Sequence, residues 1–169
     1  ESFQSHQKHS RGYELIREYM QRDFPVPDIY TERSRSAEDY VYMSQLLQAY
    51  GITKGIEAQR RSKPYNMGTL YWQLNDCWPV VSWSSIDFFG NWKALHYKAK
   101  RSFEDVLISS IVKDNTLRTY AINDKFDSIP LNLDFKIIDF NGNTIWNDIV
   151  TDILDPDESK VILAMDLNN

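Results

Sequence analysis

A dense group of aromatic and short polar residues occupies one stretch of this sequence. Aromatic residues make up 14% of the chain, and four of its five tryptophans fall between residues 65 and 97. Within that stretch, Trp72, Asn75 and Asp76 stand close together. A carbohydrate pocket needs flat aromatic faces for the apolar side of a sugar ring and amide or carboxylate groups for its hydroxyls. The stretch therefore offers candidate sugar-binding residues.

A plainer interpretation of the same residues stays open. Tryptophans commonly fill cores, while Asn75 and Asp76 are also residues that shape turns. Trp146, the remaining tryptophan, sits in an alternating run and is expected in a core. Composition does not decide between sugar binding and packing.

Other chemistries lack the residues they require. His6, His9 and His96 have no Ser/His/Asp or metal-ligand spacing around them, so we expect surface or helix-packing roles. The single cysteine, Cys77, excludes an internal disulfide and a cysteine-based zinc site, and we expect it to be a small buried residue. Glycine-rich phosphate loops are absent as well. No metal or cofactor is implied.

The charge and hydropathy of the chain bear on its partners. The net charge is −5 and the pI is near 5.2, which disfavours a phosphate-binding surface, so no nucleic acid is expected. No apolar run approaches the roughly 20 residues of a membrane span, so no membrane is expected either. No basic segment followed by an apolar one opens the chain, which leaves the compartment undetermined.

Helical periodicity dominates the first part of the chain and frames the aromatic stretch. It predicts helices over 10–23, 36–61 and about 91–103. Residues 67–74 form a nearly continuous apolar run, which is typical of a parallel strand buried on both faces. A helix followed by such a strand fits an α/β unit, and Asn75 and Asp76 would lie on the loop after it. The apolar stripe expected along the second helix comprises Tyr40, Met43, Leu46, Leu47 and Tyr50.

The remainder of the chain has a different pattern. Alternating runs predict strands over 106–112, 117–123, 131–139, 144–149 and 161–165, and Asn141-Gly142 predicts a hairpin turn. Residues 1–105 carry 14 Lys/Arg against 13 Asp/Glu, whereas residues 106–169 carry 5 against 11. This shift indicates a boundary near residue 105. The second part is expected to be an antiparallel β-sandwich with fewer strands than a complete one.

Three blocks of the first part resemble β-mannosidases of glycoside hydrolase family two. The blocks are Met67 to Pro79, Ser82 to Asp87 and Gly90 to Tyr97, and their spacing also agrees with that family. Three shorter segments upstream or nearby are similar to it too, namely 6–8, 57–61 and 64–65. The resemblance covers essentially the first 105 residues.

The resemblance implies a fold and a site. Residues 1–105 would be the C-terminal part of a (β/α)8 TIM barrel, with the Leu70-to-Asp76 run on its eighth strand. Residues 106–169 would be a partial immunoglobulin-like antiparallel β-sandwich. Trp72 would line the subsite for the terminal mannose, and Asn75 and Asp76 would shape the same strand end.

The resemblance also implies a retaining mechanism, which uses two carboxylates about 5 Å apart. In the family these are the glutamate of an Asn-Glu pair and a glutamate followed by an aromatic residue and glycine. Neither pattern occurs here, and the surroundings of Glu1 do not match. Both catalytic glutamates are therefore expected upstream. The remaining glutamates of interest lie on predicted helices, where a solvated face or an ion pair is usual; they are Glu14, Glu18, Glu38, Glu57 and Glu104.

The sequence thus predicts a fragment of an exo-acting β-mannosidase that cleaves terminal β-D-mannosyl residues from a β-mannoside or related oligosaccharide. Alone, the fragment is expected to be inactive and to self-associate through uncovered apolar faces. Alternatives are a non-catalytic carbohydrate-binding or structural module, and a family relative acting on a β-galactoside, β-glucuronide or β-glucosaminide. The resemblance favours an extracytoplasmic (periplasmic, secreted or lysosomal) setting.

Overall fold

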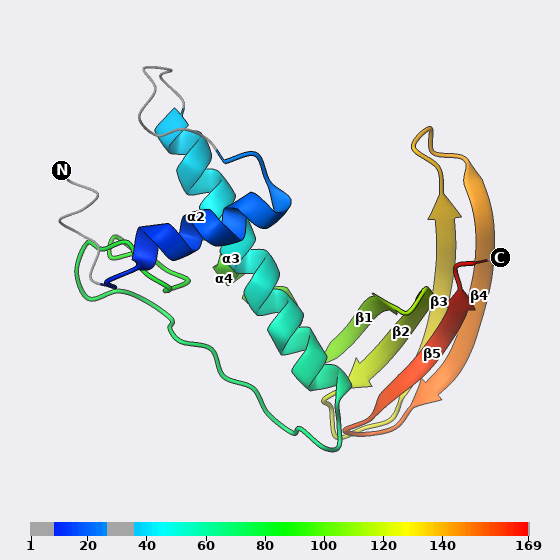
Figure 1. The fold of residues 1–169 in the computed structure, drawn as a ribbon. Coiled ribbons are helices and arrows are strands. Elements are labelled where there is room, and N and C mark those ends of the chain that lie inside the picture. The colour runs from blue at the N-terminus through cyan, green and yellow to red at the C-terminus, as the bar shows by residue number, and fades with distance from the viewer. Residues whose placement is uncertain (1–8, 27–35, 169) are drawn as a thin grey trace. The chain divides into compact units, whose positions relative to one another are not determined.

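The computed structural model describes residues 9–26 and 36–168, which form two compact units (Figure 1). The first unit contains the described residues up to Ile56 together with Leu70–Ser102, and the second contains Glu57–Thr69 and the chain from Phe103 onward. The expectations about Glu1 and His6 fall outside the described residues.

The described residues of the first unit form three helices, in agreement with the sequence prediction of a helical first part. They are α2 (Gly12–Asp23), α3 (Ser36–Arg61), whose last turn belongs to the second unit, and α4 (Ala94–Ser102). Helix α2 ends at Phe24, whose extended backbone (φ −137°, ψ 147°) is the conformation that the following proline favours. Within the described ranges, no helix has both the length and the hydrophobicity of a membrane span.

The core of the first unit joins α3 to α4 through small side chains. Ala49, Leu95 and Ala99 are its buried residues, and Ile52, Tyr71 and Ala94 pack against them. The stripe expected on α3 is wrong in its C-terminal half, because Leu46 and Tyr50 are 37% and 60% exposed. At about 100° per residue, Ile52 lies nearly opposite the middle of that stripe, whereas Ala49 lies beside its edge, about 60° from Leu46. The residues of α3 that pack toward α4 are therefore Ala49 and Ile52.

The strand expected over 67–74 is not formed. Leu70 is 99% exposed, and Met67 and Leu74 are more than half exposed, so the run is not buried on either face. A strand needs neighbouring strands to pair its backbone groups. Among the described residues the segment has only isolated bridges close by, a parallel one between Asn75 and Ile86 and an antiparallel one between Ile86 and Trp92. The apolar run therefore lacks the sheet that would make it a strand.

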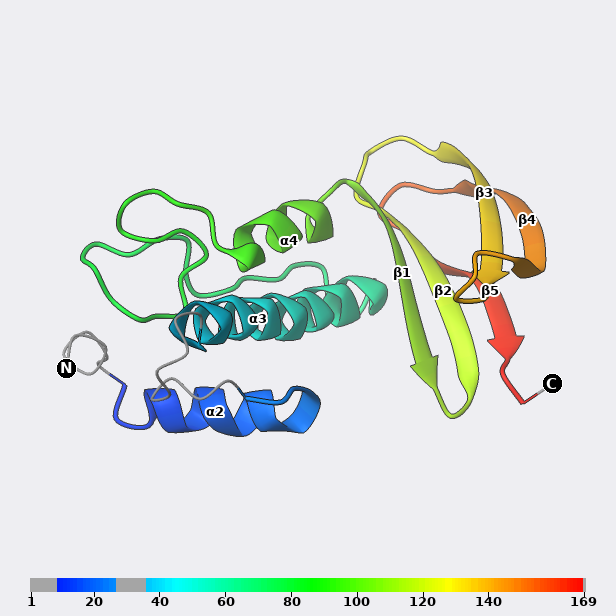
Figure 2. The same ribbon diagram turned by 90° about the horizontal axis from the view of Figure 1, so that it is seen from above.

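The second unit contains five antiparallel strands in two sheets, as the alternating pattern predicts (Figure 2). One sheet has the order β1-β2-β5 and the other consists of β3 and β4. Their bounds are Val106–Lys113 for β1, Thr116–Asn123 for β2, Ile129–Ile138 for β3, Thr144–Leu154 for β4 and Ser159–Asp166 for β5. The buried cluster of Ala121, Leu131 and Leu154 draws on both sheets, so the sheets share one core.

Two different turns close the two hairpins of this unit. Between β1 and β2, Asp114 and Asn115 both have positive φ angles of 51° and 53°, as a two-residue type I′ turn requires. The hairpin predicted at Asn141-Gly142 is confirmed between β3 and β4, but only Gly142 has a positive φ there, at 90°. Asp139 organises this longer turn, since its Oδ1 accepts the backbone N–H groups of Asn141 (2.9 Å) and Asn143 (2.8 Å).

The first unit repeats this turn with the same residue pattern, Asp-Phe-x-Gly-Asn. Asp87 Oδ1 accepts the N–H groups of Phe89 and Asn91, its Oδ2 accepts the Asn91 side-chain amide at 2.9 Å, and Gly90 has a φ of 86°. The turn holds Asn91 in place and Trp92 bridges to Ile86, so α4 starts only at Ala94, three residues later than the sequence predicts.

A buried asparagine joins the strand ends of the second unit. Asn123 is fully buried at the end of β2, and its side-chain amide donates to the carbonyl oxygens of Asp127 (2.9 Å) and Asp155 (3.0 Å). Its Oδ1 accepts the backbone N–H of Lys125 at 2.9 Å. One side chain therefore satisfies backbone groups of the loops after β2 and β4.

An ionic cluster fixes the segment after α3 within the second unit. Arg60 and Lys63, whose side chains are only 5% and 6% exposed, both contact Asp124, at 2.9 and 2.6 Å. Lys63 also contacts Asp157 at 3.1 Å. Burial is the largest single influence on Lys63 and opposes its charge, but the hydrogen bonds to Asp124 and Asp157 outweigh it, so the pKa of Lys63 is raised.

Replacing Asn123 should destabilise the second unit. Asn123→Ala leaves buried carbonyl groups without donors, and we expect the free energy of unfolding to fall by about 1–3 kcal/mol in chemical denaturation. Asn132→Ala, which alters an exposed asparagine on β3, is the matched control and should change it by less than about 0.5 kcal/mol. Equal effects of the two substitutions would contradict the role of Asn123.

The β3–β4 hairpin should loosen in acid. The Asn143 side chain, followed by the backbone donors of Asn143 and Asn141, lowers the pKa of Asp139. A lowered pKa in the folded state means that stabilisation present above about pH 4 is lost as pH falls through that pKa. The protection factors of the Asn141 and Asn143 amides, which correct for the slower intrinsic exchange in acid, should therefore fall over this range. Asp139→Asn should remove the pH dependence, and an unchanged acid transition in that variant would refute the explanation.

Candidate functional site

The three residues predicted to bind sugar lie on the segment between α3 and α4, and they face different surroundings. Trp72 is 73% exposed and Asn75 is also exposed, whereas Asp76 is 5% exposed. The peptide bond between Trp72 and Gln73 is cis. The neighbour on the other side, Tyr71, packs against the core, so the segment alternates between inward and outward side chains. The structure therefore separates one inward carboxylate from two outward groups.

The Asp76 carboxylate is enclosed by hydrogen-bond donors. The Ser82 hydroxyl lies 2.7 and 2.8 Å from its two oxygens, and the Ser84 hydroxyl donates to Oδ2 at 2.5 Å. The Gln73 amide approaches Oδ1 at 3.4 Å, and the Lys93 ammonium lies 3.6 Å from Oδ2. These donors replace the water that the buried carboxylate has lost. Asp76 is thus engaged within the loop.

Lys93 supplies the cation of this cluster from the residue before α4. Its side chain is 14% exposed, and its Nζ donates to Ser84 Oγ at 2.8 Å. Burial lowers the pKa of Lys93, although Asp76 and, more weakly, Asp87 act in the opposite direction. Lys93 and Asp76 therefore form a largely desolvated pair that shares a serine.

A second network lies beside the first and is centred on Ser85, which is fully buried. Its oxygen is 3.0 Å from the Tyr71 hydroxyl, from His96 Nδ1 and from the carbonyl oxygen of Leu74. A carbonyl can only accept, so the one hydroxyl hydrogen of Ser85 goes to Leu74. Tyr71 and His96 must then both donate, which places a hydrogen on His96 Nδ1. His96 is a helix-packing residue, as expected, with a defined tautomer.

Two glutamines of α3 hold the same loop from the other side. The Gln48 amide donates to the carbonyl oxygen of Trp83 at 2.8 Å. Gln45 Oε1 accepts the backbone N–H of Ala94 at 3.2 Å. Because Ala94 is the first residue of α4, its N–H has no partner within the helix, and Gln45 takes the place of a local cap.

Aromatic side chains surround the loop and remain accessible. Trp92 contacts two other rings edge to face, with centroid distances of 4.3 Å to His96 and 5.1 Å to Tyr97. The four tryptophans of this stretch are between 38% and 73% exposed, so in this unit they are not buried core residues. The large aromatic residues of this stretch that are more than a third exposed are Tyr65, Trp72, Trp78, Trp83, Phe88, Phe89, Trp92 and Tyr97.

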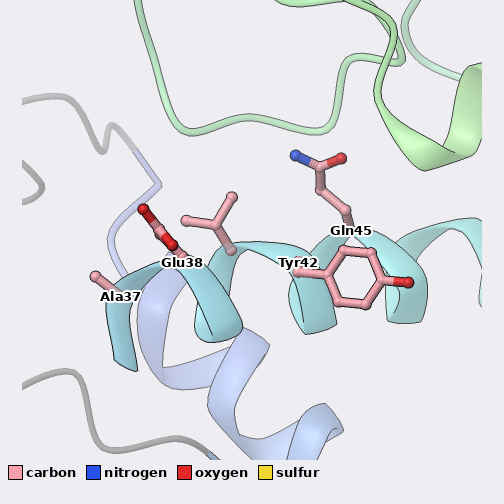
Figure 3. Close-up of a pocket in the computed structure, with 5 residues that line it drawn as sticks. Ala37, Glu38, Tyr42 and Gln45 are labelled. Atoms are coloured by element: carbon pink, nitrogen blue, oxygen red, sulfur yellow. The ribbon is translucent and has the colours of Figure 1, made fainter. Parts of the chain in front are cut away.

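An open pocket of about 400 Å³ lies in this unit, and the described residues that line it all belong to α3 (Figure 3). In Figure 3 the side chains of Glu38 and Gln45 extend from the helix toward the same side. None of the three predicted sugar-binding residues lines it. The lining residues are Ala37, Glu38, Val41, Tyr42 and Gln45.

Other candidates have ordinary surroundings. Cys77 is exposed, so the expectation of a buried cysteine is wrong; it lies between the inward Asp76 and the exposed Trp78. Glu14 and Glu18 both contact Arg11, at 2.9 and 3.1 Å. Within the described part of the chain, no group of three or more His, Cys, Asp or Glu residues is arranged to hold a metal ion.

Sequence reasoning noted the serines and Lys93 only as members of the motif and assigned them no role. The sequence Ser82-Trp-Ser84-Ser85 does carry a signal, because small hydroxyl residues two positions apart can reach one acceptor. That signal could not identify the partners of the serines. The acceptor Asp76 is nearby in sequence, whereas the donors Lys93 and His96 reach the serines only because of where α4 is placed. The donors around the carboxylate became visible only in three dimensions.

The sequence of this chain is similar to that of known β-mannosidases. No family model matches the chain. Mammalian and fungal β-mannosidases are similar to it at 27–37% identity. The goat (Capra hircus) β-mannosidase is 34% identical over 131 residues, which are 73% of this chain and 15% of that protein. The chain therefore spans about a sixth of the length of the curated relatives it matches.

Among solved structures, too, the chain is similar to a β-mannosidase. The β-D-mannosidase of Dictyoglomus thermophilum matches with a TM-score of 0.86 and 29% identity, covering 99% of this chain and 20% of that one. An exo-chitosanase of Amycolatopsis orientalis matches 78% of this chain and 18% of its own, with a TM-score of 0.62 and 18% identity, and shares the fold alone. The resemblance found in the sequence is thus confirmed, and the chain is homologous to part of the β-mannosidases of glycoside hydrolase family two.

Proposed function

We propose that the chain is part of a retaining exo-β-mannosidase that hydrolyses terminal β-D-mannosyl residues. The observation that carries the proposal is the match to the Dictyoglomus β-D-mannosidase over 99% of this chain. Because the chain spans 20% of that protein, the activity belongs to a larger enzyme of which this chain is a portion. The mammalian relatives, matched over 63–78% of the chain, support the same substrate class.

The two parts of the chain take different places in that enzyme. Residues 1–105 form the C-terminal part of a (β/α)8 barrel, for which the order of α3, connecting segment and α4 is the support. Residues 106–169 form a partial immunoglobulin-like β-sandwich, and two antiparallel sheets around one core support this assignment.

The catalytic glutamates lie outside this chain. Retention requires two carboxylates about 5 Å apart that face one substrate. In the described residues, Glu14 and Glu18 share Arg11, and Glu57 is held by Arg61 and Ser109, so each is occupied in an ion pair or hydrogen bond. These carboxylates therefore have structural roles. Without the two catalytic glutamates, the chain alone is inactive.

The chain contributes to the sugar pocket through Trp72, Asn75 and Asp76. The exposed ring of Trp72 offers an apolar face to a sugar, and Asn75 offers an exposed amide. Asp76, whose carboxylate is enclosed, shapes the segment that carries the other two. Trp72 and Asn75 therefore contact the sugar, and Asp76 fixes the shape of the segment that carries them.

Kinetics of the complete enzyme and of the isolated chain test this function. We expect the complete enzyme to cleave nitrophenyl β-mannoside in preference to the β-galactoside, β-glucuronide and β-glucosaminide, and the isolated chain to cleave none. Trp72→Ala should lower kcat/KM by about tenfold or more, since an aromatic contact of roughly 1.4 kcal/mol is a factor of ten. Trp72→Phe, which keeps an aromatic face, is the control and should lose less.

Each contrary result points elsewhere. Turnover by the isolated chain would refute the placement of the catalytic glutamates. Preference for another glycoside would indicate a relative with a different sugar specificity. A complete enzyme that cleaves none of the four would favour a non-catalytic carbohydrate-binding or structural module.

The isolated chain should self-associate. Leu70, Phe89 and Phe126 are between 75% and 99% exposed, and apolar surface of this extent favours association. Sedimentation velocity should show a mass that rises with concentration. Leu70→Ser with Phe89→Ser should reduce this rise, whereas a monodisperse monomer that unfolds cooperatively would overturn the expectation.

A further inference from the structure

The hydrogen bonds between Lys93 and Asp76 have a fixed direction. An ammonium only donates, so Lys93 donates to Ser84 Oγ at 2.8 Å. The one hydroxyl hydrogen of Ser84 is then directed to the acceptor-only carboxylate of Asp76, at 2.5 Å. Ser84 is fully buried, so water does not compete for either bond. A cation at one end and an anion at the other thus orient the serine between them.

These hydrogen bonds from Lys93 through Ser84 to Asp76, called the relay below, are connected to the residues proposed to form the sugar site. Asp76 directly follows Asn75, and its Oδ1 lies 3.4 Å from the amide nitrogen of Gln73, the residue after Trp72. The same amide nitrogen donates to the backbone carbonyl of Asn75 at 3.0 Å. A displacement of the Asp76 carboxylate would therefore change the positions of both Trp72 and Asn75.

The far end of the relay is anchored in the core of the unit. The backbone N–H of Lys93 donates to the carbonyl oxygen of Ser85 at 2.9 Å. The next residue, Ala94, donates its N–H to the side chain of Gln45 on α3. Leu95, two residues further on, is fully buried. The backbone of Lys93 is thus fixed by two elements, and its side chain transmits this position to the loop.

We propose that Lys93 is a positioning residue of the sugar site, which acts through Ser84 and Asp76 to fix the segment that carries Trp72 and Asn75. The inference rests on the proposed function for the sugar, but the geometry of the relay stands without it. A lysine that only balanced a buried charge would stabilise the fold and leave the orientation of Trp72 unaffected.

The test uses the complete enzyme with Lys93→Met, Ser84→Ala and, as the matched control, Lys98→Met, which alters an exposed lysine of α4. KM for nitrophenyl β-mannoside should rise about tenfold in K93M, with kcat changed less than about threefold, because the sugar is held less well before and during reaction. Ser84→Ala removes the relay hydroxyl without stranding a charge, and should raise KM in the same direction. The control should match the wild type.

A second readout is independent of catalysis. In enzyme labelled with fluorotryptophan, the fluorine resonance of Trp72, assigned through Trp72→Phe, should shift in K93M and S84A, while that of Trp146 stays in place. If K93M fails to fold, S84A carries the test. If both variants fold with the KM and the Trp72 resonance of the wild type, Lys93 is not a positioning residue. If the wild type cleaves no glycoside, the proposed function fails, and the Trp72 resonance still decides the positioning role.

Discussion

The buried carboxylate of Asp76 constrains the loop between α3 and α4 more than any other group in the first unit. A charge at 5% exposure is unstable unless donors replace the water it has lost. Ser82, Ser84 and Lys93 supply those donors, and each comes from a different position along the connecting segment. Polar contacts thereby tie together the part of this loop from Gln73 to Lys93, which forms no strand and so has no backbone ladder to hold it. The outward aromatic residues depend on this inward anchor.

Two turns of the molecule are stabilised by hydrogen bonds between residues that are close in sequence. Asp87 and Asp139 each begin an Asp-Phe-x-Gly-Asn sequence, and each accepts the same two backbone donors and the same asparagine amide. The glycine has a positive φ in both, where a side chain would be strained. Five residues are sufficient for this arrangement, because every partner lies within the turn. It therefore recurs both beside the helices of the first unit and between two strands of the second.

Predictions from the sequence succeeded where the signal was periodic and local. The bounds expected for the helix over 36–61 coincide with α3, and all five strands of the second unit were expected within a few residues of their places. The strand over 67–74, the stripe with Leu46 and Tyr50, and the buried Cys77 were wrong, since each depended on what would cover the segment. An apolar run specifies a strand only where neighbouring strands pair with it.

Spacing and motif along the chain were sufficient to predict the homology, α2 to α4, the five strands of the second unit, and the candidates Trp72, Asn75 and Asp76. Tertiary structure alone decided which of them face outward and which is enclosed. Sequence spacing could not connect Lys93 to Asp76, because their contact requires the loop to return past Ser84 and α4 to be anchored on α3. Hydrogen-bond geometry joins atoms in space at about 3 Å, and the position of residues along a chain does not specify that distance.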